Sequence, residues 1–217
     1  EEKNKELKQI NNNAIIADGV DDIFILVGLD KPNIGLLSPE FMEDVAKLEE
    51  KNLAVDLLEK LLRDEVKARM KTDVVSEKKY SDRIMETLRK YHNRAIETAQ
   101  VIEELIKMAK DMADDAELAE KSGLNTDEIA FYRALIQNES AVKELGDDKL
   151  RALAIFVTEQ LKKSTTVDWQ VRDSVRAKLR NLVRRALRKW KYPPDDADGA
   201  IDLCLQQAEA LSQSWSG

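Results

Sequence analysis

The sequence is poor in proline, glycine and aromatic residues. Its 217 positions include 4 Pro and 7 Gly, and 5% of the residues are aromatic, whereas 35% are charged. Strands favour aromatic and β-branched side chains, and sheets need frequent turns, so this composition disfavours a sheet protein. We therefore predict an all-α fold with long, solvent-exposed helices.

The chain also has too few cysteine and histidine residues for the usual structural metal sites. Cys204 is its single cysteine and His92 its single histidine, which excludes an internal disulfide and a site with two His ligands. Cys204 shares one helical face with four apolar residues, which predicts a buried small side chain rather than a reactive thiol. His92 follows Tyr91 in a helical pattern, where we expect a surface or packing role.

Long apolar runs are absent as well. No uninterrupted apolar segment approaches the roughly 20 residues that span a bilayer, and no signal-peptide pattern opens the chain. We expect a soluble, cytoplasmic protein without a membrane partner. The first residue is Glu1, in a charged segment, which suggests a piece of a larger protein.

The sequence lacks the common catalytic motifs. The phosphate-binding motif G-x-x-x-x-G-K-[S/T] does not occur, and Ser140 lacks the Gly-x-Ser-x-Gly frame of hydrolases. A Pro-Asp pair at Pro194 and Asp195 suggests a metal-dependent nuclease motif, but no Glu-x-Lys follows it. We predict no catalytic residue, no metal site and no cofactor in this chain.

A long seam of apolar residues is the most extended pattern that the chain does contain. Its members recur at alternating steps of four and three, and no Pro or Gly interrupts them before Gly123. Small residues in the seam favour a close intramolecular neighbour over a parallel two-chain coiled coil. We predict a helical bundle built on one long helix over residues 76–121. The seam consists of Ile84, Leu88, Tyr91, Ala95, Thr98, Ile102, Leu105, Ala109 and Met112.

Shorter helical patterns fill the rest of the chain. We expect a connecting segment over residues 1–19, a first helical subdomain over 20–123 and a second over 124–217. Ser38 before Pro39 is a favourable helix start, and Gly123 is a favourable helix end. The shorter helices are expected over residues 20–29, 38–50, 52–70, 126–137, 147–163, 169–191 and 195–214.

The helix predicted over residues 169–191 carries the strongest charge asymmetry. Between Gln170 and Tyr192 there are nine basic residues and one acid, a charge of +8 in a chain of net charge −7. An apolar row at steps of four, from Val171 to Leu187, predicts packing into a groove of another helix. A row of arginines runs beside it. The candidate residues for binding a partner or DNA phosphates are Arg172, Arg176, Arg180, Arg184, Arg185, Arg188 and Lys189.

Three interpretations of this basic helix are open. In the first, the arginines pair with an acidic surface of their own chain, such as the run from Asp111 to Glu120. In the second, they bind carboxylates of a partner protein or an adjoining domain. In the third, they bind the phosphates of DNA or RNA, which arginine-rich helices suit. A pI near 5 argues against the third, because nucleic-acid-binding domains are typically basic.

Several blocks of the sequence together resemble one known family. One block starts at Thr166-Val167-Asp168-Trp169, continues through the arginine row and ends at Tyr192-Pro193-Pro194. Others lie at Asn93-Arg94-Ala95-Ile96, at Glu128-Ile129-Ala130-Phe131-Tyr132 and at Asn52-Leu53-Ala54. These blocks resemble the C-terminal helical region of the R subunit, the motor and nuclease subunit, of type I restriction-modification enzymes.

The resemblance implies an activity for the parent enzyme and a narrower role for this chain. The parent would cleave unmethylated foreign DNA after ATP-driven translocation, with ATP and Mg bound by nuclease and motor domains whose motifs this chain lacks. The helical region would follow the motor and help to attach the R subunit to the methyltransferase core. Its implied partners are the methyltransferase and specificity subunits and the adjoining motor domains. Contact of the basic helix with double-stranded DNA is the alternative.

Overall fold

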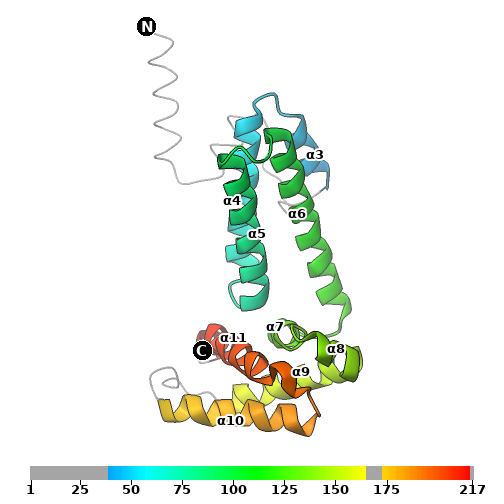
Figure 1. Cartoon of the computed structure of the whole chain (residues 1–217), viewed down its shortest axis with the longest axis vertical. Coiled ribbons are helices and arrows are strands. Elements are labelled where there is room, and N and C mark those ends of the chain that lie inside the picture. The colour runs from blue at the N-terminus through cyan, green and yellow to red at the C-terminus, as the bar shows by residue number, and fades with distance from the viewer. Residues whose placement is uncertain (1–38, 165–172, 216–217) are drawn as a thin grey trace. The chain divides into compact units, whose positions relative to one another are not determined.

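The computed structural model describes residues 39–164 and 173–215. These residues form nine α-helices and one 3-10 helix and contain no strand, which confirms the predicted all-α fold (Figure 1). The connecting segment predicted over 1–19 and the helix predicted over 20–29 lie outside the described residues. The elements are α3 (Pro39–Lys47), α4 (Lys51–Arg69), α5 (Val74–His92), α6 (Thr98–Lys121), α7 (Thr126–Leu135), α8 (Glu139–Leu145), α9 (Asp147–Ser164), α10 (Asp173–Lys189), η1 (Pro194–Asp196) and α11 (Ala197–Trp215).

The described residues divide into two compact units. Unit 1 contains residues 39–65 and 82–114, and unit 2 contains residues 66–81 and 115–215 with the gap already given. Each of the helices α4, α5 and α6 contributes residues to both units. Neither unit is therefore one continuous stretch of chain. The subdomain boundary near residue 123 stays a prediction.

The single long helix expected over residues 76–121 is wrong, because the chain turns between α5 and α6. At the end of α5, Arg94 adopts a left-handed conformation with φ of 56°. The amide of Ala95 donates to the carbonyl of Lys90 at 2.8 Å, and the amide of Arg94 donates to that of Tyr91 at 2.9 Å. This pair of bonds is the Schellman motif, which ends a helix and usually has glycine at the left-handed position. Because arginine rather than glycine occupies that position, the sequence pattern did not reveal the turn.

After this turn, α6 runs back along α5 in the opposite direction. Within unit 1, the Thr87 hydroxyl donates to Glu104 at 3.0 Å, and Arg83 pairs with Asp111 at 2.8 Å. The earlier residue of α5 contacts the later residue of α6, as expected for antiparallel helices. The seam is buried on both helices but not at the turn, where Ala95 is exposed. The apolar seam was therefore correctly read as a packing surface, although its two halves lie on two antiparallel helices.

The two left-handed residues that end helices are expected to limit stability. Arg94 and Lys191 both have φ of 56°, where a side chain is strained and glycine is not. We expect Arg94→Gly and Lys191→Gly each to raise the free energy of unfolding by about 0.5–1 kcal/mol. Urea unfolding followed by circular dichroism measures this. As a control, Lys110→Gly inside α6 is expected to lower the free energy of unfolding by about 1 kcal/mol; an equal loss at Arg94 would contradict the prediction.

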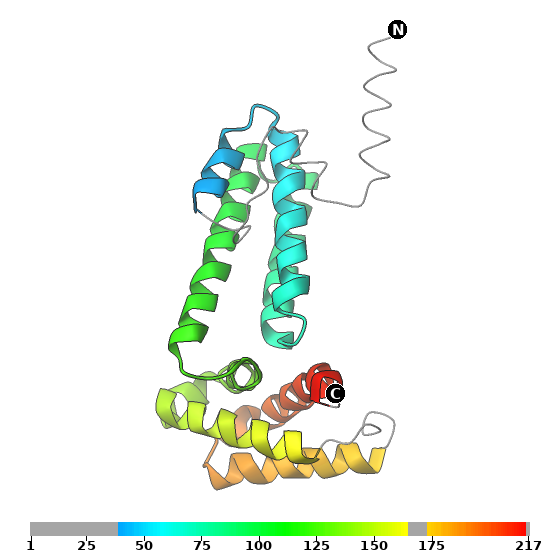
Figure 2. The same ribbon diagram turned by 180° about the vertical axis from the view of Figure 1, so that it is seen from behind.

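The core of unit 2 is built around α7. Helix α7 packs against α9 and α11, and α10 packs against the same two helices (Figures 1 and 2). Phe131 of α7 is fully buried and stacks on Trp215 of α11, with ring centroids 6.2 Å apart. The residues of this core that belong to α9 and α11 are Leu150, Leu153, Ala154, Val157, Leu161, Ala200, Ile201, Cys204, Leu205, Ala208 and Leu211.

The ends of α6, α7 and α8 follow local sequence signals. Gly123, with φ of 73°, follows the end of α6 as predicted. Asn125 and Glu128 form a capping box at the start of α7. Asn138 caps α8, a helix for which the sequence gave us no prediction, by accepting from the amides of Ser140 and Ala141. Of the helices described, none is both long and apolar enough to cross a lipid bilayer.

Candidate interaction surface on helix α10

One face of α10 is buried as the sequence predicted. Leu179, Val183 and Leu187 are at most 2% exposed and contact the core of unit 2, and Val175 is half-buried against it. Val171, the first residue of the predicted row, lies outside the described residues, as does Arg172. The steps of four therefore mark the face of α10 that docks on its own unit.

Two arginines of the predicted row pair with carboxylates of the neighbouring helix α11. Arg180 binds Asp202, and Nη2 of Arg184 lies 3.3 Å from Oδ1 of Asp198. The first interpretation of the row is thus correct for these two arginines, with α11 as the acidic surface. The acidic run between residues 111 and 120 has other partners: Asp111 pairs with Arg83, Asp115 with Lys79, and Glu117 with Lys121.

The outward face of α10 remains cationic after this pairing. Arg176, Lys178, Arg185 and Arg188 are exposed, and none of them forms an ion pair with another described residue. Among the described residues, the Arg185 guanidinium donates to the carbonyl of Asn181, at 3.3 Å, and to no carboxylate. An open groove runs along this face, and the residues described as lining it include no acidic side chain. Its lining residues are Ser174, Ala177, Lys178, Asn181, Arg184, Arg185 and Arg188.

Lys189 lies at the other edge of α10 and faces α9. Its Nζ is 5.0 Å from the centre of the Phe156 ring, a cation–π contact. Together with Arg185, it borders a small pocket between α9 and α10. The helix predicted over residues 147–163 gave no sign of this pocket, because half-buried and fully buried phenylalanines give the same periodic signal.

The C-terminal end of α10 is fixed by a second Schellman motif and by two polar contacts. The amide of Tyr192 donates to the carbonyl of Leu187 at 2.9 Å. The Tyr192 hydroxyl, whose pKa is raised by burial, donates to the carbonyl of Leu135 at 2.7 Å. Nearby, hydrogen bonds from Ser140 and Asn138 hold the pKa of Asp195 below its usual value. The Tyr-Pro-Pro-Asp segment therefore anchors the basic helix to α7 and α8, and the helix stops before the prolines.

Cys204 is buried in the core of unit 2, as predicted for a small apolar side chain. Burial raises the pKa of its thiol to about 12. At pH 8 the thiolate population is then about 10³-fold smaller than for an exposed cysteine of pKa about 8.5. We expect labelling of native protein with a maleimide or an aromatic disulfide to be slower than labelling in urea by at least that factor. Labelling of the native protein within seconds would contradict the burial of Cys204.

The described part of the chain does not assemble a metal site. It contains no group of three or more His, Cys, Asp or Glu side chains close enough to hold a metal ion. His92 is exposed at the end of α5. The geometry therefore defines a helical domain whose most distinctive surface is the outward, cationic face of α10.

Comparison with known proteins assigns this helical domain to a family. Residues 1–214 match the family described as type I restriction enzyme HindI endonuclease subunit-like, C-terminal. The chain therefore belongs to this family of C-terminal domains of type I restriction endonuclease subunits, as its sequence blocks suggested. No solved structure gives a significant match.

Two curated relatives extend the comparison. The chain is 41% identical over 211 residues to the HindI type I restriction endonuclease subunit of Haemophilus influenzae. This match covers 97% of this chain and 20% of that protein. It is 28% identical over 191 residues to the proposed MjaIXP type I restriction endonuclease subunit of Methanocaldococcus jannaschii. This second match covers 85% of this chain and 18% of that protein. The chain thus spans about a fifth of the length of each relative.

Proposed function

We propose that this chain docks its endonuclease subunit on the methyltransferase core of a type I restriction enzyme, through the outward face of α10. The observation that carries the proposal is the arrangement of charge on that helix. Two arginines are neutralised by α11, while Arg176, Lys178, Arg185 and Arg188 face outward without an acidic partner among the described residues. A rigid helix held by its apolar row presents these cations in fixed positions, which favours recognition of a complementary acidic surface.

The proposal places the chemistry of the parent enzyme outside this chain. Cleavage of unmethylated DNA, ATP-driven translocation, and the ATP and Mg that they require would belong to the remaining four-fifths of the subunit. The methyltransferase and specificity subunits would form the surface that receives α10, with the motor domains adjoining it. We place the assembled enzyme in the cytoplasm.

A second candidate function is contact with the phosphates of double-stranded DNA. The open groove on α10 favours it, because its described lining includes Lys178, Arg185 and Arg188, which have no acidic partner among the described residues. Binding of this kind would weaken steeply with salt and depend little on DNA sequence. The two candidates therefore differ in partner and in salt dependence.

The affinity of the full-length subunit for its methyltransferase core tests the first proposal. We expect the pair Arg176→Glu and Arg188→Glu to weaken binding at least about tenfold, because the reversed charges repel an acidic surface. Neither arginine pairs with α11, so helicity and thermal stability should stay unchanged. Isothermal titration of the core with each subunit measures the dissociation constant.

The matched control is the pair Lys107→Glu and Lys110→Glu on α6. Both lysines are exposed, and this pair lowers the net charge of the chain, −7, by the same four units. It should leave the affinity unchanged. An equal loss in both pairs would indicate a general charge effect and contradict the proposal. Unchanged core binding with loss of salt-dependent DNA binding in the Arg176/Arg188 pair would favour the second candidate.

A further inference from the structure

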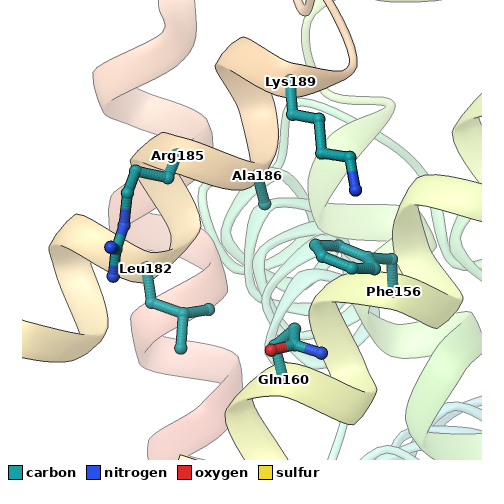
Figure 3. Close-up of a pocket in the computed structure, with 6 residues that line it drawn as sticks. All are labelled: Phe156, Gln160, Leu182, Arg185, Ala186 and Lys189. Carbon is teal, nitrogen blue, oxygen red and sulfur yellow. The ribbon is translucent and has the colours of Figure 1, made fainter.

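The pocket between α9 and α10 lies beside the cationic face and has a volume of about 280 Å³. Phe156 and Gln160 of α9 form one wall, and Leu182, Arg185, Ala186 and Lys189 of α10 form the other (Figure 3). This volume is near the lower limit for small-molecule sites, which are usually about 300–1,000 Å³. The pocket therefore suits one or two side chains of a partner better than a cofactor.

The lining of the pocket combines an apolar wall with positive charge. Phe156 and Leu182 are only half-buried, although both pack against the core. Lys189 lies over the Phe156 ring, and Arg185 lines the pocket on the side of Leu182, away from Phe156 (Figure 3). None of the lining residues that the structure describes is acidic. An apolar group that carries a carboxylate beside it would satisfy both parts of this lining.

Arg185 joins the pocket to the cationic face. Its side chain lines both the pocket and the open groove that continues along α10 through Lys178 and Arg188. Phosphates would be bound by the cations of the groove and would make no use of the half-buried Leu182. A protein segment would use both the cations and Leu182, because an apolar side chain would anchor it while its acidic neighbours pair with the cations.

We propose that this pocket receives an acidic segment of the methyltransferase core, with one aliphatic or aromatic side chain inserted between Phe156 and Leu182. The inference rests on the proposed docking function and deepens it, since it names the chemistry of the partner segment. The inserted side chain supplies an apolar anchor. The carboxylates beside it pair with Arg185 and Lys189.

Two substitutions test the pocket without changing the exposed arginines. Leu182→Ser removes apolar surface at constant charge, and Gln160→Glu places a carboxylate in the pocket at nearly constant shape. In the full-length subunit, we expect each to raise the dissociation constant for the methyltransferase core about tenfold, mainly through faster dissociation. Gln160→Glu should also reduce the salt dependence of binding, since it cancels one positive charge of the pocket.

Matched controls lie outside the pocket on the same unit. Leu118, which is 67% exposed, provides Leu118→Ser, and the exposed Gln206 provides Gln206→Glu. Neither should change the affinity, and circular dichroism verifies that every variant is folded. Because Gln160→Glu is nearly isosteric, it keeps the test valid if Leu182→Ser unfolds.

The outcomes separate the pocket from the docking function. If the pocket variants bind the core like the unsubstituted subunit while the Arg176/Arg188 pair loses affinity, the pocket proposal is overturned and the docking function stands. If deletion of these 217 residues from the subunit leaves its affinity for the core unchanged, the pocket proposal and the docking proposal are both wrong. If Leu182→Ser and Gln160→Glu weaken binding to duplex DNA but not to the core, the occupant is nucleic acid and the pocket proposal is again wrong.

Discussion

Replacement of Phe131 by alanine is expected to lower the free energy of unfolding of unit 2 by about 3–5 kcal/mol. Phe131 is fully buried at the centre of α7, and its ring stacks on that of Trp215 at 6.2 Å. Truncation removes its buried apolar area and leaves a cavity that neighbouring helices fill only in part. Trp215 is fixed independently by a hydrogen bond from its indole nitrogen to Asp127 at 2.7 Å, so it is poorly placed to fill the cavity.

Tryptophan fluorescence during urea unfolding measures this loss. Trp190 and Trp215, the two described tryptophans, both belong to unit 2, so the signal reports on that unit. The control is Leu118→Ala at a position that is 67% exposed, where a change below about 0.5 kcal/mol is expected. A loss below about 1 kcal/mol at Phe131 would mean that α7 is not central to the core.

The second large effect is expected for Arg133→Ala, on the opposite side of α7. The Arg133 guanidinium binds the Asp73 carboxylate and donates to the carbonyl of Asp115 at 3.2 Å. Asp73 is 8% exposed and also caps α5, where it accepts from the amide of Ser76 at 3.1 Å. Without Arg133, a buried carboxylate loses its cationic partner. We expect a loss of about 3 kcal/mol in the free energy of unfolding, the lower end for buried ion pairs because Arg133 is 21% exposed.

A double-mutant cycle separates the ion pair from the cap. Asp73→Asn keeps an N-cap oxygen while it removes the charge, so Arg133→Ala in that background should cost much less than in the unsubstituted chain. Urea midpoints of the four proteins give the coupling energy. Additive losses would contradict the pairing of Asp73 with Arg133.

Most of the helices could be predicted from the sequence, because apolar periodicity and helix-capping residues mark their positions. The steps of four on α10 correctly predicted that Leu179, Val183 and Leu187 are buried. The turn at Arg94 was missed for a physical reason. Its backbone bonds end the helix without glycine or proline, and apolar spacing continued across the turn by coincidence. The stop at Lys191 has the same cause, and the predicted end of this helix at residue 191 lies two residues beyond the observed end at Lys189.

The candidate surface was predictable only in outline. The sequence identified the basic residues of α10. Which carboxylates pair with them depends on the helix that lies beside α10, and the sequence does not specify that helix. The structure shows that α11 brings Asp202 to Arg180 and Asp198 to Arg184. The pocket beside Phe156 has no sequence signal, because two helices create it. Arg172 lies outside the described residues, so its place on this surface stays a prediction.

The central claim is that this chain attaches its endonuclease subunit to the methyltransferase core. Size-exclusion chromatography coupled to light scattering, with the purified 217-residue chain and its cognate core in the absence of DNA, tests it most directly. The full-length subunit serves as the positive control. We expect the chain to co-elute with the core at the mass of a complex, and the Arg176→Glu and Arg188→Glu pair to elute separately. Separate elution of the folded, unsubstituted chain, under conditions where the full-length subunit co-elutes, would contradict the claim.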